Sequence, residues 1–223
     1  RLLLARLNDM KLLLENWRKY LNEGIKTLET LPEDYFIEIS RSSDFSGARD
    51  GYKLRLLQLN KEGKLLDELG TGYVVTAFDV GDFDPRQEDE AECDLDGFDT
   101  RLFEDLYTLH LYFESVKGQG YGPLIADIAM EIAFHDGKMI IPAKLVGGAG
   151  APGAQKLYDF YYTKRGDVEI EPFSIHCWEE YTGWELDDED YDDLPESFLA
   201  LYSKAPDILK SPMAKKKIIW EDN

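Results

Sequence analysis

Apolar side chains recur at alternating spacings of four and three residues at the start of the chain. This period is typical of an amphipathic helix, and it predicts a helix over residues 2–22. Gly24 is of a residue type that ends helices. The apolar stripe consists of Leu3, Leu7, Met10, Leu14, Trp17 and Leu21. It provides a face for docking on the rest of this chain, on a second copy in an oligomer, or on a partner protein.

After Pro32 the period changes to the strict alternation of half-buried strands. The strands that this pattern predicts lie at residues 35–40, 52–59, 72–80 and 106–116. From residue 123 onward, helical and apolar stretches alternate. They predict a helix at 123–134, a short buried strand at 138–142, a helix at 154–164 and a strand at 168–175. Antiparallel strands followed by this β–α–β–α–β order predict an α+β fold, with a mixed, mainly antiparallel sheet and flanking helices.

The same pattern divides the chain into three parts. Residues 1–24 form the amphipathic N-terminal helix, residues 33–178 form the α+β domain, and residues 179–223 form an acidic loop with a polar C-terminal tail. A flexible glycine-rich loop is expected at 147–153, before the second helix of the domain.

Acidic residues are concentrated in two segments, and this concentration changes the picture of the surface. The chain of 223 residues has a formal charge of −20, of which segment 79–99 contributes −9 and segment 179–196 contributes −10. Two solvated loops are the simplest interpretation; a cation site and a surface that imitates nucleic acid are the alternatives. Direct binding of DNA or RNA is disfavoured, because it needs clustered Lys and Arg side chains.

Composition also bears on the cellular location. No run of apolar residues approaches the length of a membrane span, and the first residues lack the order of a signal peptide. Cys93 and Cys177 make no disulfide framework, which favours a reducing compartment. We therefore expect a protein of the cytoplasm that is not inserted into a membrane.

The segment Lys117-Gly-Gln-Gly-Tyr-Gly-Pro123 carries the most chemical information. Its three alternate glycines lie between a predicted strand and a helix, where they present backbone N–H groups without intervening side chains. Amides at the positive end of a helix bind a diphosphate well. The glycine spacing matches neither the P-loop nor the dinucleotide fingerprint. A turn that merely lets the helix pack closely is the structural alternative.

This segment resembles motif A of the GNAT acyltransferase superfamily, which reads [Gln/Arg]-x-x-Gly-x-[Gly/Ala] and opens a helix after a strand. Ala154-Gln-Lys-Leu157-Tyr158 resembles the family's later helix, and the likeness covers residues 106–175. Within it, the stretch from Gly120 to Glu131 looks like a divergent subset common in phage genomes. Residues 10–23 are also similar to the leader of marine phage proteins, which adds a virion to the expected locations.

The resemblance implies that acetyl-CoA or another acyl-CoA is the cofactor, held at its pyrophosphate by backbone amides. A main-chain N–H near Ser115–Val116 then bonds the thioester carbonyl, where one strand splays from its neighbour. The cofactor-binding residues carried over by position are Ser115, Val116, Lys117, Gly118, Gln119, Gly120, Tyr121 and Gly122.

The resemblance also implies catalytic roles. Tyr158 is the acid that protonates the departing thiolate, and Tyr162, one helical turn further, is the reserve. Glu114 is the candidate base, and alternation puts His110 on the same face of that strand. For Tyr158 the alternative is core packing, and for Glu114 it is a solvent-facing strand position.

Several positions depart from the family pattern. Lys117 stands where Gln or Arg is usual, and Ala151 stands where a polar residue, often Asn, grips the cofactor. These departures keep open a non-catalytic phage or virion protein that acts through protein–protein contacts. Residues 92–97 match the first half of an EF-hand loop, but Phe103 occupies the twelfth position, so no metal site is predicted.

Overall fold

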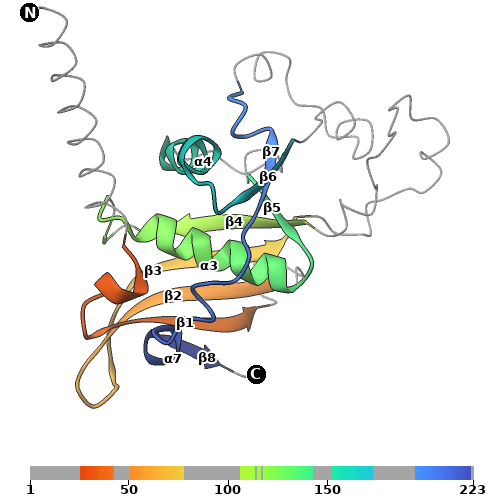
Figure 1. Cartoon of the computed structure of the whole chain (residues 1–223). Coiled ribbons are helices and arrows are strands. Elements are labelled where there is room, and N and C mark those ends of the chain that lie inside the picture. Colours follow the sequence, from red (N-terminus) through yellow and green to blue (C-terminus); the bar gives the residue numbers. More distant parts are fainter. Residues whose placement is uncertain are drawn as a thin grey trace, which may run out of the picture.

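The computed structural model describes residues 26–42, 51–77, 106–113, 115–116, 118–142, 152–172 and 194–221 (Figure 1). The elements in chain order are η1 (Leu28–Thr30), β1 (Tyr35–Ser42), β2 (Gly51–Leu59), β3 (Leu65–Thr76), β4 (Leu106–Tyr112), α3 (Tyr121–His135), β5 (Met139–Ile141), α4 (Pro152–Lys164), β6 (Glu169–Pro172), β7 (Ala200–Ser203), α7 (Ala214–Lys217) and β8 (Ile218–Glu221). The predicted helix at 2–22, the first acidic segment and nearly all of the second lie outside the described residues.

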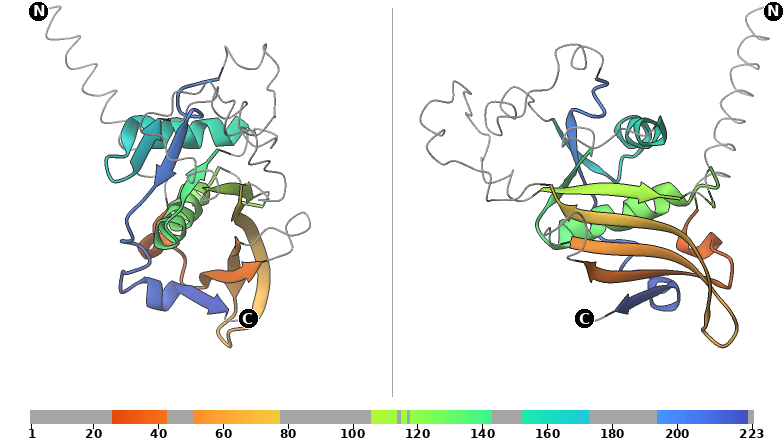
Figure 2. Two further views of the ribbon diagram at one scale, coloured as in Figure 1. Left: turned by 90° about the vertical axis from the view of Figure 1, so that its right-hand side faces the viewer. Right: turned by 180° about the vertical axis from the view of Figure 1, so that it is seen from behind.

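The strands form one curled sheet in the order β6-β7-β5-β4-β3-β2-β1-β8. Neighbours pair antiparallel except for β4 with β5 and β1 with β8, which are parallel. Figure 2 shows the face of β1 to β4 that lies opposite α3. The predicted α+β fold with a mainly antiparallel sheet is therefore confirmed.

Most predicted elements are present, with shifted ends. β3 begins at Leu65, earlier than predicted, and β4 ends at Tyr112, earlier than the predicted strand. β7 and β8 were not predicted, because residues 179–223 were assigned to a loop and a tail. In the structure, these later residues complete the sheet at both sides, with β7 beside β5 and β8 beside β1.

Helix α3 covers one face of the sheet (Figure 1). Its apolar side chains are buried against strand residues such as Ile37, Leu54 and Val74. Gly72 on β3 allows this close approach, because a Cβ atom there would lie 2.9 Å from Cγ2 of Ile125. The helix is buried on more than one side, since Asp127 and Glu131 are also enclosed.

A strap, residues 204–213, crosses the outer side of α3 and connects β7 to α7 and β8 (Figure 1). The strap is attached through Glu131, which is fully buried on α3. Its carboxylate accepts hydrogen bonds from Lys204 Nζ at 2.6 Å and from the backbone N–H groups of Ile208 at 2.9 Å and Leu209 at 2.8 Å. One carboxylate thus fixes the path of the strap over the helix.

The C-terminal end of α3 is attached to the sheet by a second carboxylate. Asp136 accepts hydrogen bonds from the hydroxyls of Tyr52 on β2 and Tyr107 on β4, both at 2.9 Å. Burial and this bond to Asp136 raise the pKa of Tyr52 to about 12. Both tyrosines therefore stay protonated and keep donating at neutral pH.

Replacing Gly72 with alanine tests the close packing of α3 on the sheet. The added methyl group has no space beside Ile125, so Gly72→Ala should lower the free energy of unfolding by about 1–3 kcal/mol. Gly153→Ala in α4 is the matched control, because nothing lies within 4 Å of its added Cβ. The control should leave stability unchanged or raise it by up to about 1 kcal/mol. Denaturant unfolding of both variants measures the difference, and equal effects would contradict the packing described here.

Candidate functional site

The glycine loop, residues 118–122, follows β4 and includes the first two residues of α3. Gly118 and Gly120 have φ angles of 78° and 85°, a left-handed conformation that side-chain-bearing residues avoid. Gly120 is the N-cap of α3, and its carbonyl accepts a hydrogen bond from the backbone N–H of Lys26 at 3.0 Å. The loop conformation thus requires the glycines that the sequence places there.

The start of α3 retains the features of an anion site. Within the described part of the chain, no side chain caps this helix end, and its first turn has no acidic residue. The N–H groups of Tyr121 and Gly122 lie in that first turn, where helical bonding leaves such groups without carbonyl partners. The positive end of the helix dipole lies at the same place. These are the two features from which a phosphate-binding loop was expected, and phosphate binding itself stays a prediction.

The strand before the loop pairs with its parallel neighbour over only part of its length. Leu106 to Thr108 of β4 pair with Met139 to Ile141 of β5, and there β5 ends. β4 continues to Tyr112, and its other edge stays paired with β3. The pairing between the two parallel strands thus ends before the glycine loop.

The predicted residues around the loop fall into three groups. Ser115 Oγ donates to the carbonyl of Leu69 at 2.9 Å, so this side chain ties the loop to β3, and Val116 is buried. Glu114, the candidate base, and Lys117 lie outside the described residues. His110 lies on β4 opposite Tyr73 of β3.

Tyr158 on α4 is enclosed in an aromatic cluster. Only 5% of its surface is exposed, and its ring centroid lies 5.0 Å from that of Tyr202 and 5.7 Å from that of Phe198. Its hydroxyl is buried and has no hydrogen-bond partner in the described structure. Burial raises the pKa of Tyr158 above the ordinary value for tyrosine. The hydroxyl is therefore held protonated, with its bonding capacity unused.

Tyr162 lies in a more exposed environment than Tyr158 does. It is 39% exposed, and its hydroxyl donates to Glu196 Oε2 at 3.2 Å. This hydrogen bond is the main reason that the pKa of Tyr162 lies above the ordinary value for tyrosine. The structure thus does not bring the hydroxyl of the reserve acid into the enclosed environment of Tyr158.

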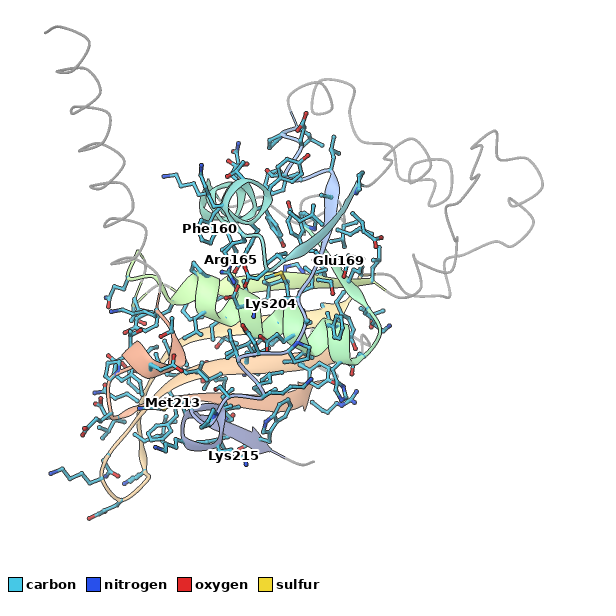
Figure 3. All side chains as sticks on the ribbon, in the orientation of Figure 1. Phe160, Arg165, Glu169, Lys204, Met213 and Lys215 are labelled. Carbon is cyan, nitrogen blue, oxygen red and sulfur yellow. The ribbon has the colours of Figure 1, made fainter. Side chains whose placement is uncertain are left out.

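Two buried carboxylates on α3 were not singled out from the sequence. Asp127 and Glu131 stand four residues apart in an otherwise apolar helix, and this spacing puts them on one side of it. Asp127 binds Arg165 and Tyr161, and Glu131 binds Lys204. Figure 3 shows Arg165, near the end of α4, and Lys204, at the start of the strap, beside α3. The sequence does contain a signal that could have revealed them, namely two acidic residues four positions apart within an apolar helix.

A cavity of about 380 Å³ opens beside these groups, between α3, the strap and the segment before η1. Its lining includes Lys26, Asp127, Arg165, Lys204 and Asp207, and none of the predicted site residues.

No cluster of three His, Cys, Asp or Glu side chains among the described residues could hold a metal ion. No helix in the described part of the chain is both long and apolar enough to cross a membrane.

Removing the hydroxyl of Tyr158 tests whether it lacks a partner. A buried hydroxyl without a hydrogen bond destabilises a fold, so Tyr158→Phe should raise the free energy of unfolding by about 1 kcal/mol. Tyr161→Phe on the same helix is the matched variant. It removes a donor from the buried Asp127 and should lower stability by about 1–3 kcal/mol.

The difference in stability between wild type and Tyr158→Phe should also depend on pH. The pKa of Tyr158 is raised in the folded state, so ionisation of this tyrosine favours the unfolded chain. The wild-type protein should therefore lose stability as pH rises above the unfolded pKa of about 10, and it should lose none by this route at lower pH. The stability gain of Tyr158→Phe should therefore grow between about pH 10 and 11. Urea unfolding at several pH values measures it. A gain that stayed constant with pH, or a loss, would show that the hydroxyl has a partner or ionises freely.

Comparison with known proteins identified no matching family model, no matching curated protein and no matching solved structure. The functional conclusion therefore depends on the residues of this chain and on the likeness of its two motifs to the GNAT pattern.

Proposed function

We propose that the protein is a GNAT-like acyltransferase that moves an acyl group, such as acetyl, from acyl-CoA to an amine. The observation that carries the proposal is the glycine loop, which has two left-handed glycines, Gly118 and Gly120, immediately before the uncapped start of α3. The order of β4, loop, α3, parallel β5 and α4 is also the order that the motif resemblance implies.

The residues present fit the cofactor in two respects. The backbone amides of Tyr121 and Gly122 lie at the positive end of α3, where they would hold the pyrophosphate. Tyr158 supplies a buried hydroxyl that has no partner among the described residues. The proposal requires that the bound thioester reach this hydroxyl. A buried polar atom left unbonded in the free protein is consistent with a group kept for such a ligand.

Acyl-CoA would supply an activated thioester, whose carbonyl carbon accepts the amine. The new C–N bond forms as the C–S bond breaks, so one proton must leave the nitrogen and one must reach the sulfur. Tyr158 is the acid for the sulfur, because its hydroxyl is protonated at neutral pH. Glu114 or an ordered water takes the proton from the nitrogen. A backbone N–H near Ser115–Val116 stabilises the charge that develops on the carbonyl oxygen.

We also propose a phage origin for this protein and a location in the host cell or the virion. The similarity of residues 10–23 and of the glycine-loop region to phage proteins supports a phage-encoded protein, which acts in the cytoplasm of the host cell or is carried in the virion.

The second candidate is a non-catalytic protein of the same fold that acts through protein–protein contacts. The enclosure of Tyr158 favours it, because a hydroxyl packed between Phe198 and Tyr202 must become accessible before it can protonate a thiolate. The two candidates differ in whether the glycine loop binds a cofactor.

Titration of the full chain with acetyl-CoA by calorimetry tests the proposal. Wild-type protein should bind saturably, and Gly120→Glu should abolish binding, because its carboxylate would occupy and repel the pyrophosphate site. Gly137→Glu is the matched control. It places the same side chain at a left-handed glycine, φ 73°, at the opposite end of α3, and it should bind like wild type.

The result that would overturn the acyltransferase proposal is an absence of wild-type binding at millimolar acetyl-CoA. Equal binding by wild type and Gly120→Glu would show instead that the cofactor does not use the glycine loop. Either result would favour the non-catalytic candidate.

A further inference from the structure

Asp127 connects α3 to the C-terminal part of α4. Its Oδ1 atom lies 2.8 Å from the hydroxyl of Tyr161 and 3.2 Å from Nη1 of Arg165, and its Oδ2 atom lies 3.0 Å from Nη2 of Arg165. Asp127 is 7% exposed and Tyr161 is 1% exposed, so both residues are buried, while the Arg165 side chain is 17% exposed and lines the cavity beside them. A bidentate pair with an arginine fixes direction as well as distance. We call Asp127, Tyr161 and Arg165 the clamp.

The clamp also reaches the first turn of α3. The hydroxyl of Tyr161 lies 2.9 Å from the carbonyl oxygen of Pro123, so its single proton is shared between that oxygen and Asp127. Pro123 directly follows the glycine loop. The clamp therefore joins α4 to the part of α3 that begins at the loop.

Arg165 is held from its other side. Its Nε and Nη2 atoms donate to the two carboxylate oxygens of Asp167, each at 2.6 Å, and its guanidinium lies 5.5 Å from the ring centroid of Tyr161. With partners on both sides, the guanidinium has little freedom to turn. The contact between the helices is therefore stiff.

Tyr158 needs a positioning device of this kind. Its hydroxyl makes no hydrogen bond within the described structure, so only the path of α4 and the packing of its ring determine where the oxygen lies. Tyr158 and Tyr161 are three residues apart and share one side of α4. Fixing Tyr161 against α3 therefore fixes Tyr158 relative to the glycine loop.

We infer that the clamp positions Tyr158 relative to the bound cofactor, so that Asp127, Tyr161 and Arg165 are positioning residues for acyl transfer. This inference rests on the proposed function, since it presupposes a cofactor on the glycine loop. Catalysis is sensitive to such placement, because a misplacement of about 1 Å reduces rates by about a hundredfold.

Glu131 provides a matched control on the same helix. It is a buried carboxylate one turn after Asp127, and it binds the strap through Lys204 and two backbone amides rather than α4. Asp127→Asn and Glu131→Gln each remove one buried negative charge with little change in shape. Only Asp127→Asn should disturb α4.

The experiment follows the tyrosine ring carbons by NMR while acetyl-CoA is added to the full chain. The Tyr158 signal is assigned by its absence in Tyr158→Phe. In wild type and in Glu131→Gln, acetyl-CoA should shift this signal. Asp127→Asn should bind acetyl-CoA with unchanged affinity and lose the shift. Tyr161→Phe, which removes one oxygen atom and retains the ring, should behave in the same way and stands in if Asp127→Asn fails to fold.

Each result decides a separate question. A shift retained in both Asp127→Asn and Tyr161→Phe would overturn the clamp inference and leave the acyltransferase proposal intact. Loss of acetyl-CoA binding in Tyr161→Phe would also overturn it, because the clamp would then act on the loop instead of Tyr158. Absence of binding in wild type would remove both the inference and the proposed function.

Discussion

The need to neutralise two carboxylates inside an apolar helix organises much of this structure. A buried charge without a partner is very unfavourable, so Asp127 and Glu131 require cations and N–H groups from elsewhere in the chain. Asp127 takes its partners from α4 and the residue after it, and Glu131 takes its partners from the strap. Two segments that follow α3 at different distances along the chain are thereby attached to the same helix. The position of α4, which carries Tyr158, depends on the first attachment, and the path to β8 depends on the second.

The strap carries the chain from one side of the sheet to the other. β7 lies beside β5, and β8 lies at the opposite edge, where it extends the sheet in parallel with β1. Lys217, just before β8, donates to the carbonyl oxygens of Pro32, Glu33 and Tyr35. The last residues therefore cover an edge that would otherwise present unpaired backbone groups.

The sequence predicted the elements whose side chains follow a clear period. The alternation in residues 35–40 and 52–59 and the apolar spacing of 123–134 led to β1, β2 and α3 with small errors at the ends. The glycine loop was also predicted, because three alternate glycines stand between a strand pattern and a helix pattern, and two of them have left-handed φ angles in the structure. By contrast, β7 and β8 have four residues each, too few to show alternation, and they follow a strongly acidic segment. Their strand character depends on distant neighbours rather than on local pattern.

The candidate site could be predicted only in its local part. Helical spacing placed Tyr158 and Tyr162 on similar faces, but it could not show that Phe198 and Tyr202 enclose one of them while the other reaches Glu196. The partners of Asp127 and Glu131 were likewise invisible, because both bonds join residues far apart in the chain. Glu114 and Lys117 lie outside the described residues, and their roles stay predictions.

The position of β8 has a consequence for how the protein is made. The contact between Lys217 and Pro32 joins residues 185 positions apart, so it cannot form until residue 217 has left the ribosome. Until then the nascent chain exposes the open edge of β1, and contacts of such long range form slowly. The sheet therefore stays incomplete until β8 has been made, and the edge of β1 can be captured by aggregation partners or chaperones during that interval.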